Sequence, residues 1–251
     1  MKKIQKKNLK KKIKQEHFDA SIICPLFNEV NYINTKLIKF IKKIKASKQN
    51  YEILVVDNNS TDGTTQKLKR LKNKKIFRNI TFIFNKKNLG KGGSVKKACK
   101  IAKGKYCCIF DIDEYFASDL LKGIKIAQRK SFDFLIGTRI NEKNKYLYIY
   151  KANFYGVKFL TWLINILYGL KLTDAAAAIK IFNKKKYNTI KLNSSGFDFE
   201  FELICKFAKK NFSISEFYSN YKPRSFAEGK KLIAWKDGSK ILIIILKTLF
   251  R

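Results

Sequence analysis

The chain has 251 residues, 45% of them hydrophobic, and its 55 lysines and arginines against 19 aspartates and glutamates give a formal charge of +36. A chain of this length can bury one substantial core and is ordinary for a single α/β domain. Only two prolines occur, and no Gly/Ser-rich stretch divides the chain. We therefore expect one domain over residues 19–251, preceded by a disordered lysine-rich arm over residues 1–18.

The excess of basic residues favours a polyanionic partner, which can be nucleic acid, anionic lipid or a phosphorylated substrate. Arginine stands at only six positions, whereas proteins that read nucleic acid depend on the bidentate fork of arginine. The lysines are scattered along the chain, so a general compositional bias explains them as well as a membrane-surface function does. We expect no nucleic-acid partner.

Histidine and cysteine chemistry is largely excluded. The single histidine, His17, precedes the first expected strand, which excludes histidine-based zinc sites and leaves one candidate for any Ser-His-Asp triad. Five cysteines, an odd number without C-x-x-C spacing, predict buried, reduced thiols in a cytosolic compartment. The chemistry must then use carboxylates, lysines, arginines or a bound metal.

Targeting and membrane-spanning signals are weak. No apolar stretch follows the N-terminal charges, so we expect no secretory signal. The longest uncharged apolar run, residues 159–170, has 12 residues, whereas a bilayer span needs about 20. We therefore predict a protein without a transmembrane helix that can still lie on a membrane surface.

In chain order, short β-branched runs alternate with helical patterns over the first half. Strands are expected at 20–24, 51–56, 81–84, 106–110 and 132–137, and helices at 32–45, 64–71, 93–102 and 119–128. This alternation predicts an α/β fold with a mostly parallel sheet flanked by helices, whose ligand binds beyond the carboxyl ends of the strands. The second half is less regular, with helices expected at 154–170, 197–208 and 240–250.

A carboxylate cluster follows the fourth expected strand, in the order Asp111-Ile112-Asp113-Glu114. Residues i and i+2 of a strand point to the same side, so Asp111 and Asp113 can converge on one point. Two such carboxylates suit Mg²⁺ or Mn²⁺, which prefer oxygen ligands. The alternative is a pair of solvated acids at the start of a loop, but three clustered acids in so basic a chain favour a functional site.

Two other strand ends carry candidate ligands for a nucleotide or phosphate. Asp57 closes the second strand and can accept a hydrogen bond from a base or ribose, while the turn over residues 58–63 can equally serve to cap the next helix. The glycine-rich loop 88–94 opens a helix with Lys91 nearby, which suits an anion. It matches neither the P-loop nor the dinucleotide fingerprint.

Taken in order, these motifs resemble the family 2 glycosyltransferases with the GT-A (Rossmann-like) fold. The matching residues are Pro25-x-x-Asn28-Glu29, Val55-Val-Asp57-Asn-x-Ser-x-Asp62-Gly, Asn88-x-Gly90-Lys91-Gly92-Gly93 and the DXD motif Asp111-x-Asp113. Downstream, Gly137-Thr-Arg139, Thr173-Asp174, Lys180-Ile-Phe182, Phe197-Asp198-Phe-Glu200 and Pro223-Arg224-Ser-x-Ala-Glu228-Gly229-Lys230-Lys231 are similar to the dolichyl-phosphate mannose synthase branch and its bacterial polyprenyl-phosphate relatives. The resemblance covers roughly residues 20–240.

The resemblance implies roles for individual residues. The nucleotide-sugar would be bound by Pro25, Phe27, Glu29, Val55, Asp57, Lys91 and Ile112. A divalent ion, Mg²⁺ or Mn²⁺, would be held by Asp111 and Asp113, with Glu114 as a substitute third ligand because Tyr115 stands where the family often has glutamine. The donor and acceptor phosphates would meet Arg139, Lys151, Arg224 and Lys230, and catalysis would depend on Asp111, Asp113, Arg139 and Arg224.

The activity that the resemblance implies is an inverting, metal-dependent transfer of a hexose from GDP-mannose or a UDP-sugar to a polyprenyl or dolichyl phosphate. The enzyme would be peripheral on the cytoplasmic face of a membrane, with amphipathic interface helices near 154–170 and 240–250, although both can equally be core or dimer helices. Three alternatives stay open: a family 2 transferase with a saccharide or other non-lipid acceptor, a basic nucleic-acid- or membrane-binding protein without catalysis, and a non-catalytic GT-A scaffold. The sugar and the oligomeric state are not predicted.

Overall fold

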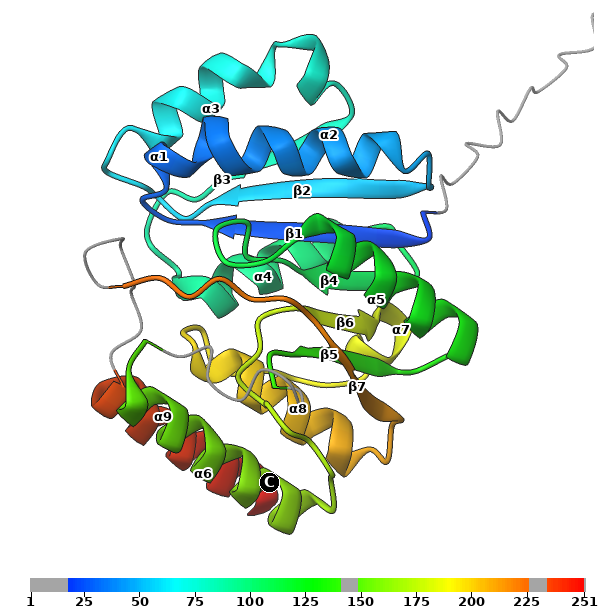
Figure 1. Cartoon of the computed structure of the whole chain (residues 1–251), viewed down its shortest axis with the longest axis vertical. Helices are drawn as coiled ribbons and strands as arrows, with labels where there is room; N and C mark the ends of the chain where they lie inside the picture. Colours follow the sequence, from blue (N-terminus) through cyan, green and yellow to red (C-terminus); the bar gives the residue numbers. More distant parts are fainter. Residues whose placement is uncertain (1–17, 141–148, 226–233, 251) are drawn as a thin grey trace, which may run out of the picture.

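A computed structural model describes residues 18–140, 149–225 and 234–250. The described residues form one seven-stranded sheet in the order β3-β2-β1-β4-β6-β5-β7 (Figure 1). Its strands are β1 (Ala20–Leu26), β2 (Tyr51–Asp57), β3 (Ile80–Phe84), β4 (Tyr106–Ile109), β5 (Phe134–Thr138), β6 (Lys180–Asn183) and β7 (Ile214–Tyr218).

The helices expected from the sequence are present, with their ends moved by a few residues. They are α1 (Val30–Tyr32), which continues through a π-helical turn (Ile33–Leu37) into α2 (Ile38–Ala46), then α3 (Thr64–Lys72), α4 (Gly90–Ile101), α5 (Ala117–Lys130), α6 (Lys151–Tyr168), α8 (Asp198–Lys209) and α9 (Ala234–Phe250). The short helix α7 (Lys184–Tyr187) was not predicted. A short 3₁₀ turn (Lys75–Phe77) precedes β3. No described helix is both long and apolar enough to cross a bilayer.

The prediction of a mostly parallel sheet flanked by helices is confirmed, with one difference in the second half. Strand β1 pairs in parallel with β2 and β4, and β2 with β3, so their carboxyl ends meet at one edge. The unpredicted strand β6 runs antiparallel between β4 and β5, and β7 adds a last parallel strand beside β5. Both strands are short, and no regular alternation with helices marks them in the sequence.

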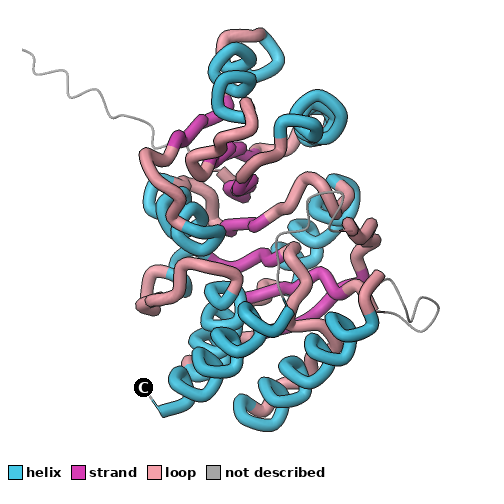
Figure 2. The backbone as a smooth tube through the Cα atoms, turned by 90° about the vertical axis from the view of Figure 1, so that its left-hand side faces the viewer, coloured by secondary structure: helices cyan, strands magenta, loops and turns pink. Residues whose placement is uncertain are grey.

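Two hydrophobic cores form on opposite faces of the sheet, because successive strand residues point to opposite sides. Ile22 and Cys24 of β1 join the core under α2, α3 and α5, whereas Ile23 joins the core under α4 and α8. Helices α6 and α9 lie side by side against α8, on the outside of this second core (Figure 1). Viewed at a right angle, the strands form a column with helices on both sides (Figure 2).

Helix α4 packs unusually closely against the segment that leads into α8. The amides of Gly92 and Gly93 donate to the carbonyls of Gly196 and Ser195 at 3.3 and 3.0 Å. A Cβ atom on Gly92 would lie 2.3 Å from the Cβ of Phe199. Glycine therefore permits the close approach that places the start of α4 beside the start of α8.

Gly92→Ala is expected to lower the free energy of unfolding by about 1–3 kcal/mol, the usual cost of overpacking. Gly156→Ala is the matched control, because nothing lies within 4 Å of a Cβ at that helical position, and alanine should there raise the free energy of unfolding by up to about 1 kcal/mol. Urea denaturation measures both. Equal stability of the Gly92 variant and the wild type would contradict the close packing of α4 on α8.

Candidate active site

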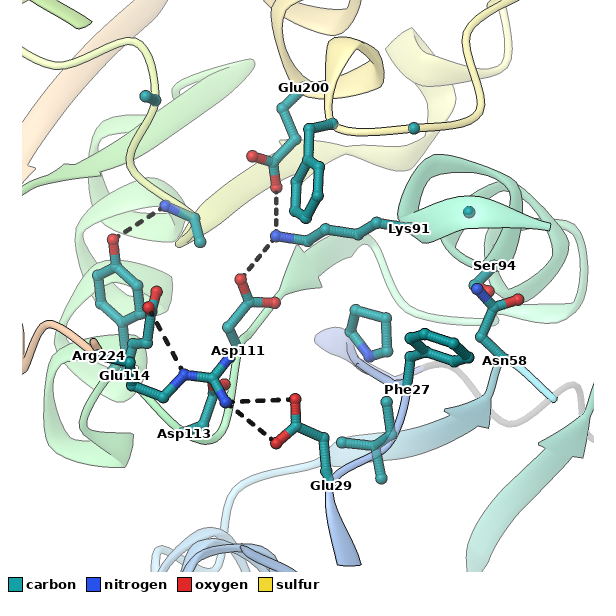
Figure 3. A pocket seen from close by; sticks show the side chains of 18 of the residues that line it. Phe27, Glu29, Asn58, Lys91, Ser94, Asp111, Asp113, Glu114, Glu200 and Arg224 are labelled. Atoms are coloured by element: carbon teal, nitrogen blue, oxygen red, sulfur yellow. Dashed lines mark hydrogen bonds and ion pairs between the residues drawn. The ribbon is translucent and has the colours of Figure 1, made fainter. Parts of the chain in front are cut away.

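A cavity of about 370 Å³ lies at the carboxyl ends of β1 and β4. The start of α4 and the start of α8 contribute further walls (Figure 3). Helix α6, the segment with Ala176 and Ala178, and the pair Tyr221 and Arg224 contribute the others. The cavity brings together nine of the residues that the sequence singled out, namely Pro25, Phe27, Glu29, Lys91, Asp111, Asp113, Glu114, Arg139 and Arg224. Residues more than 190 positions apart in the chain thus meet at one edge of the sheet.

Lys91 connects one of the strand-end carboxylates to a residue of α8. Its ammonium lies 2.6 Å from Oδ2 of Asp111 and 2.9 Å from Oε1 of Glu200 (Figure 3). The other oxygen of Glu200 lies 3.5 Å from the ammonium of Lys180, a side chain with no exposed surface. Burial alone would raise the pKa of Glu200, but the cations Lys180 and Lys91 outweigh it and hold that pKa below its ordinary value. Glu200 is therefore a weak base.

Arg224 contacts three carboxylates at once. Its guanidinium forms an ion pair with Asp113, approaches Glu29 at 3.2 Å and lies 3.8 Å from Glu114 (Figure 3). The guanidinium also lies over the ring of Tyr32, 5.4 Å from its centroid. Burial, followed by the charges of Asp113 and Asp111, raises the pKa of Glu114 to about 7. Arg224 is thus the counter-ion for an acidic cluster drawn from two strand ends.

Arg139 is held in a bidentate pair. Its Nε and Nη2 atoms donate to the two carboxylate oxygens of Asp174 at 2.6 and 2.7 Å, and both residues are buried. Burial alone would raise the pKa of Asp174, but the guanidinium holds it below the ordinary value of 3.8. The Arg139 guanidinium also lies over the ring of Tyr221, 5.0 Å from its centroid. The pair and the ring fix the direction in which this cation faces the cavity.

The charges around the cavity leave it acidic inside a strongly basic chain. Its described lining has five carboxylates, from Glu29, Asp111, Asp113, Glu114 and Glu200, against three cations, from Lys91, Arg139 and Arg224. With every group ionised, five negative and three positive groups give a formal charge of −2, and the raised pKa of Glu114, about 7, makes the charge less negative at neutral pH. A buried excess of negative charge is costly unless a cation offsets it, so the cavity suits a divalent cation.

The residues at the end of β4 fit Mg²⁺ or Mn²⁺ as a two-carboxylate anchor. Asp111 and Asp113 both line the cavity, and such ions are commonly held by one or two carboxylates with substrate phosphates completing the shell. Among the described residues, no group of three or more His, Cys, Asp or Glu side chains is arranged to hold a metal. Glu114 also lines the cavity, where its carboxylate faces Arg224 and the hydroxyl of Tyr221, and its role as a third ligand stays a prediction.

Three expected nucleotide ligands do not line this cavity. Val55 is fully buried in the core under α2, and Ile112 lines a neighbouring depression beside Phe40. Asp57 is buried, and its carboxylate accepts hydrogen bonds from the hydroxyls of Ser60 and Thr65. Asp57 thus organises the turn after β2, while Asp62 in that turn accepts from the amide of Thr64 at the start of α3 at 3.0 Å, and the role of Asp57 toward a nucleotide stays a prediction.

Two expected phosphate ligands are also absent from the lining that the structure describes. Lys151 is exposed at the start of α6 and does not line the cavity, whereas Asn153, two residues further along the helix, does. Lys230 and the adjacent Lys231 lie outside the described residues. So does the lysine-rich arm as far as His17.

The structure adds site residues that sequence reasoning did not select. Asn58, next to Asp57, lines the cavity and donates to Oδ1 of Asn88 at 2.8 Å, while its own Oδ1 accepts from Asn85 and from the amide of Leu89. Glu200 was part of a quoted motif without an assigned role. In both cases the signal was a polar residue in a matching motif, but the partners come from distant segments.

Comparison with known proteins decides the family. The model for "Glycosyl transferase family 2" matches residues 21–200, well over half of the chain. The chain belongs to this family. The prediction made from the motifs is thereby confirmed, together with the GT-A fold seen in structural neighbours of the chain.

Two curated relatives share a name. The dolichyl-phosphate beta-glucosyltransferase of Saccharomyces cerevisiae is 28% identical over 95% of this chain and 73% of its own length. The protein of the same name from Dictyostelium discoideum is 37% identical over 37% of this chain, and the match spans only 30% of that relative.

Solved structures share the fold at low sequence identity. Glucosyl-3-phosphoglycerate synthase of Mycobacterium tuberculosis superposes with a TM-score of 0.69 at 12% identity, covering 93% of this chain and 80% of that one. The mannosyltransferase PcManGT of Pyrobaculum calidifontis, solved with GDP-Man and Mn²⁺, has a TM-score of 0.60 at 16% identity, covering 93% and 64%. These neighbours show the architecture in which the cavity is set.

Asp174→Asn is expected to destabilise the fold by about 3 kcal/mol at pH 7, because it breaks a buried ion pair. The pKa of Asp174 is depressed on folding, so its contribution is complete well above pH 3.8 and is lost as the pH falls through that value toward the folded-state pKa. The gap between wild type and variant should therefore shrink in acid. Urea unfolding at pH 7, 5, 4 and 3 measures it, with the exposed Asp19→Asn as control. A gap that stays constant with pH would contradict the pairing.

Proposed function

We propose that this chain transfers a hexose, with inversion, from a nucleotide-sugar to a polyprenyl or dolichyl phosphate, and that the transfer depends on Mg²⁺ or Mn²⁺. The observation that carries this proposal is the acidic cavity at the end of β4, lined by Asp111 and Asp113 and by three cations. Membership of the transferase family and the GT-A fold support the same reaction class.

Asp111 and Asp113 would hold the ion. When bound, a divalent ion supplies positive charge that stabilises the departing nucleoside diphosphate. Arg224 and Lys91, released from these carboxylates, are the cations available to the donor phosphates inside the same cavity. Pro25, Phe27, Asn58 and Ser94 line its other side and offer apolar and amide surface to the nucleoside.

The bond change proposed is an in-line displacement at the anomeric carbon. A phosphate oxygen of the acceptor forms the new bond as the bond to the nucleoside diphosphate breaks, through an oxocarbenium-like state. A hydroxyl acceptor would need a general base, for which Glu200 is poorly suited because Lys180 and Lys91 depress its pKa, whereas Glu114, with a pKa raised to about 7, is the suitable group. A phosphate acceptor is already anionic at neutral pH and needs no such base.

A lipid-linked acceptor fits the apolar part of the cavity and the helix beside it. Val157, Ala176 and Phe197 line the cavity with apolar surface, and α6 supplies both Asn153 and Val157 to it. The two relatives named dolichyl-phosphate beta-glucosyltransferase act, by that name, on a lipid phosphate. We infer the same acceptor class for this chain.

Helices α6 and α9 also carry an exposed apolar face, which supports peripheral contact with a membrane. On α6 the exposed residues recur at helical spacing, and α9 repeats the pattern: Tyr155, Phe159, Trp162 and Ile166, then Ile243, Leu246 and Phe250. The two helices are joined by a hydrogen bond from Tyr168 to the carbonyl of Ile245 at 2.5 Å. Aromatic side chains and flanking lysines are typical of a helix that lies in the interface of a bilayer.

We place this contact on the cytoplasmic face. The five cysteines are all buried and unpaired, as expected in a reducing compartment. The basic chain would be attracted to the anionic lipids of that leaflet.

An acceptor screen tests the proposal. The protein is incubated with polyprenyl phosphate and a panel of GDP- and UDP-sugars, with Mg²⁺, Mn²⁺ or EDTA, and with phosphoglycerate as the soluble arm. Transfer to polyprenyl phosphate that EDTA abolishes is the expected result. Transfer to phosphoglycerate alone, or transfer unchanged by EDTA, would overturn the acceptor or the metal requirement respectively.

In the same assay Asp113→Asn is expected to reduce turnover about a hundredfold or more, as losses of comparable electrostatic groups do. The exposed Asp19→Asn is the matched control and should remain near wild-type activity. Near-normal turnover of a folded Asp113→Asn protein would contradict the role of this carboxylate as a metal ligand.

Trp162→Glu combined with Phe159→Glu is expected to weaken binding to vesicles containing anionic lipid by about tenfold or more, because two apolar side chains lose a buried environment. Ile101→Glu is the control, since Ile101 is equally exposed but lies on α4. Vesicle co-sedimentation measures the change. Unaltered binding of the double variant would show that this face does not contact lipid.

A further inference from the structure

The two carboxylates at the end of β4 are neutralised in the same way. Each pairs with a cation, and that cation touches a second carboxylate on another element. Lys91 bridges Asp111 and Glu200, and Arg224 bridges Asp113 and Glu29 (Figure 3). The second carboxylate of each bridge comes from outside the DXD motif.

Glu200 is firmly held on the Lys91 side. It lies in the first turn of α8, is 4% exposed and has a second cation, Lys180, at 3.5 Å. Lys180 itself is anchored to the carbonyl of Ala177. An ammonium that leaves Asp111 would therefore still have a fixed, buried carboxylate within reach of the same side chain.

Arg224 is held near residues 111–114, which follow β4, by backbone contacts as well as by Glu29. The amide of Lys222 donates to the carbonyl of Glu114 at 2.9 Å, and Tyr221 forms a β-bridge with Tyr115. Glu29 is 6% exposed. A guanidinium that leaves Asp113 thus stays near residues 111–114 and remains paired with the buried carboxylate of Glu29.

A divalent ion on these carboxylates repels the ammonium and the guanidinium that lie at contact distance, because like charges repel strongly in a buried site. Ion binding therefore weakens the contacts of both cations with Asp111 and Asp113 and favours their displacement. A buried charge left without a partner is costly. Glu200 and Glu29 would remove that cost.

We propose that Lys91 and Arg224 are exchangeable counter-ions of the metal site, and that Glu200 and Glu29 are positioning residues that keep them when a divalent ion takes Asp111 and Asp113. This inference rests on the proposed function in one respect, the binding of the ion at that pair. It assigns to Glu200 and Glu29 an effect on ion affinity that acts through the two cations. Without a nucleotide the ion competes with both cations, so its affinity is weak.

The test is a double-mutant cycle on Mn²⁺ affinity, measured by electron paramagnetic resonance without nucleotide. Lys91→Met is expected to tighten Mn²⁺ binding about tenfold, and Glu200→Gln to weaken it severalfold, within the range of direct couplings. In the Lys91→Met background the effect of Glu200→Gln should shrink to about twofold or less. Lys100→Met, on the exposed side of the same helix, is the control for loss of one positive charge and should change little.

Through-space electrostatics makes the opposite prediction for the double variant. Glu200 would then help Mn²⁺ as much with Lys91 present as without it, so equal effects of Glu200→Gln in both backgrounds would overturn the exchange. The cycle of Arg224→Met with Glu29→Gln is an independent copy of the test, should Glu200→Gln not fold. Absence of any Mn²⁺ binding to the wild type, even with UDP, would instead overturn the metal site of the proposed function.

Discussion

The neutralisation of buried charge is the constraint on which this site depends. A chain with a formal charge of +36 gathers five of its 19 acidic residues around one cavity. The parallel pairing of β1 with β2 and β4 forces this arrangement, since it brings their carboxyl ends to one edge. Every acid there must be paired or hydrogen-bonded, and the partners come from segments far apart in the chain.

These pairs make the fold and the site interdependent. Lys91 at the start of α4 reaches Glu200 on α8, and their approach requires the glycine at position 92. Arg224, from the segment after β7, closes the other side against Glu29 beyond β1. The ion pairs are therefore also tertiary contacts, and a substitution of one member should alter the contacts of the others.

Local sequence predicted the elements whose pattern is local. The alternating runs of the first half fixed the strands up to β5, and the acids after β4 marked the edge that carries the cavity. The strands β6 and β7 were not predicted because no regular alternation of strands and helices marks the second half of the sequence. Local sequence does not predict which side chains reach the cavity. Asp57 and Asn58 are adjacent, yet only Asn58 lines the cavity, to which its contacts with Asn85 and Asn88 bring it.

The proposed reaction requires Asp111 and Asp113 to hold a divalent ion together in this cavity. Crystals grown with Mn²⁺ and a nucleoside diphosphate, with diffraction recorded at the manganese absorption edge, would locate that ion. One anomalous peak is expected between these two carboxylates, beside the diphosphate. A bound nucleotide with no anomalous peak there, or with the peak elsewhere in the molecule, would contradict this metal site.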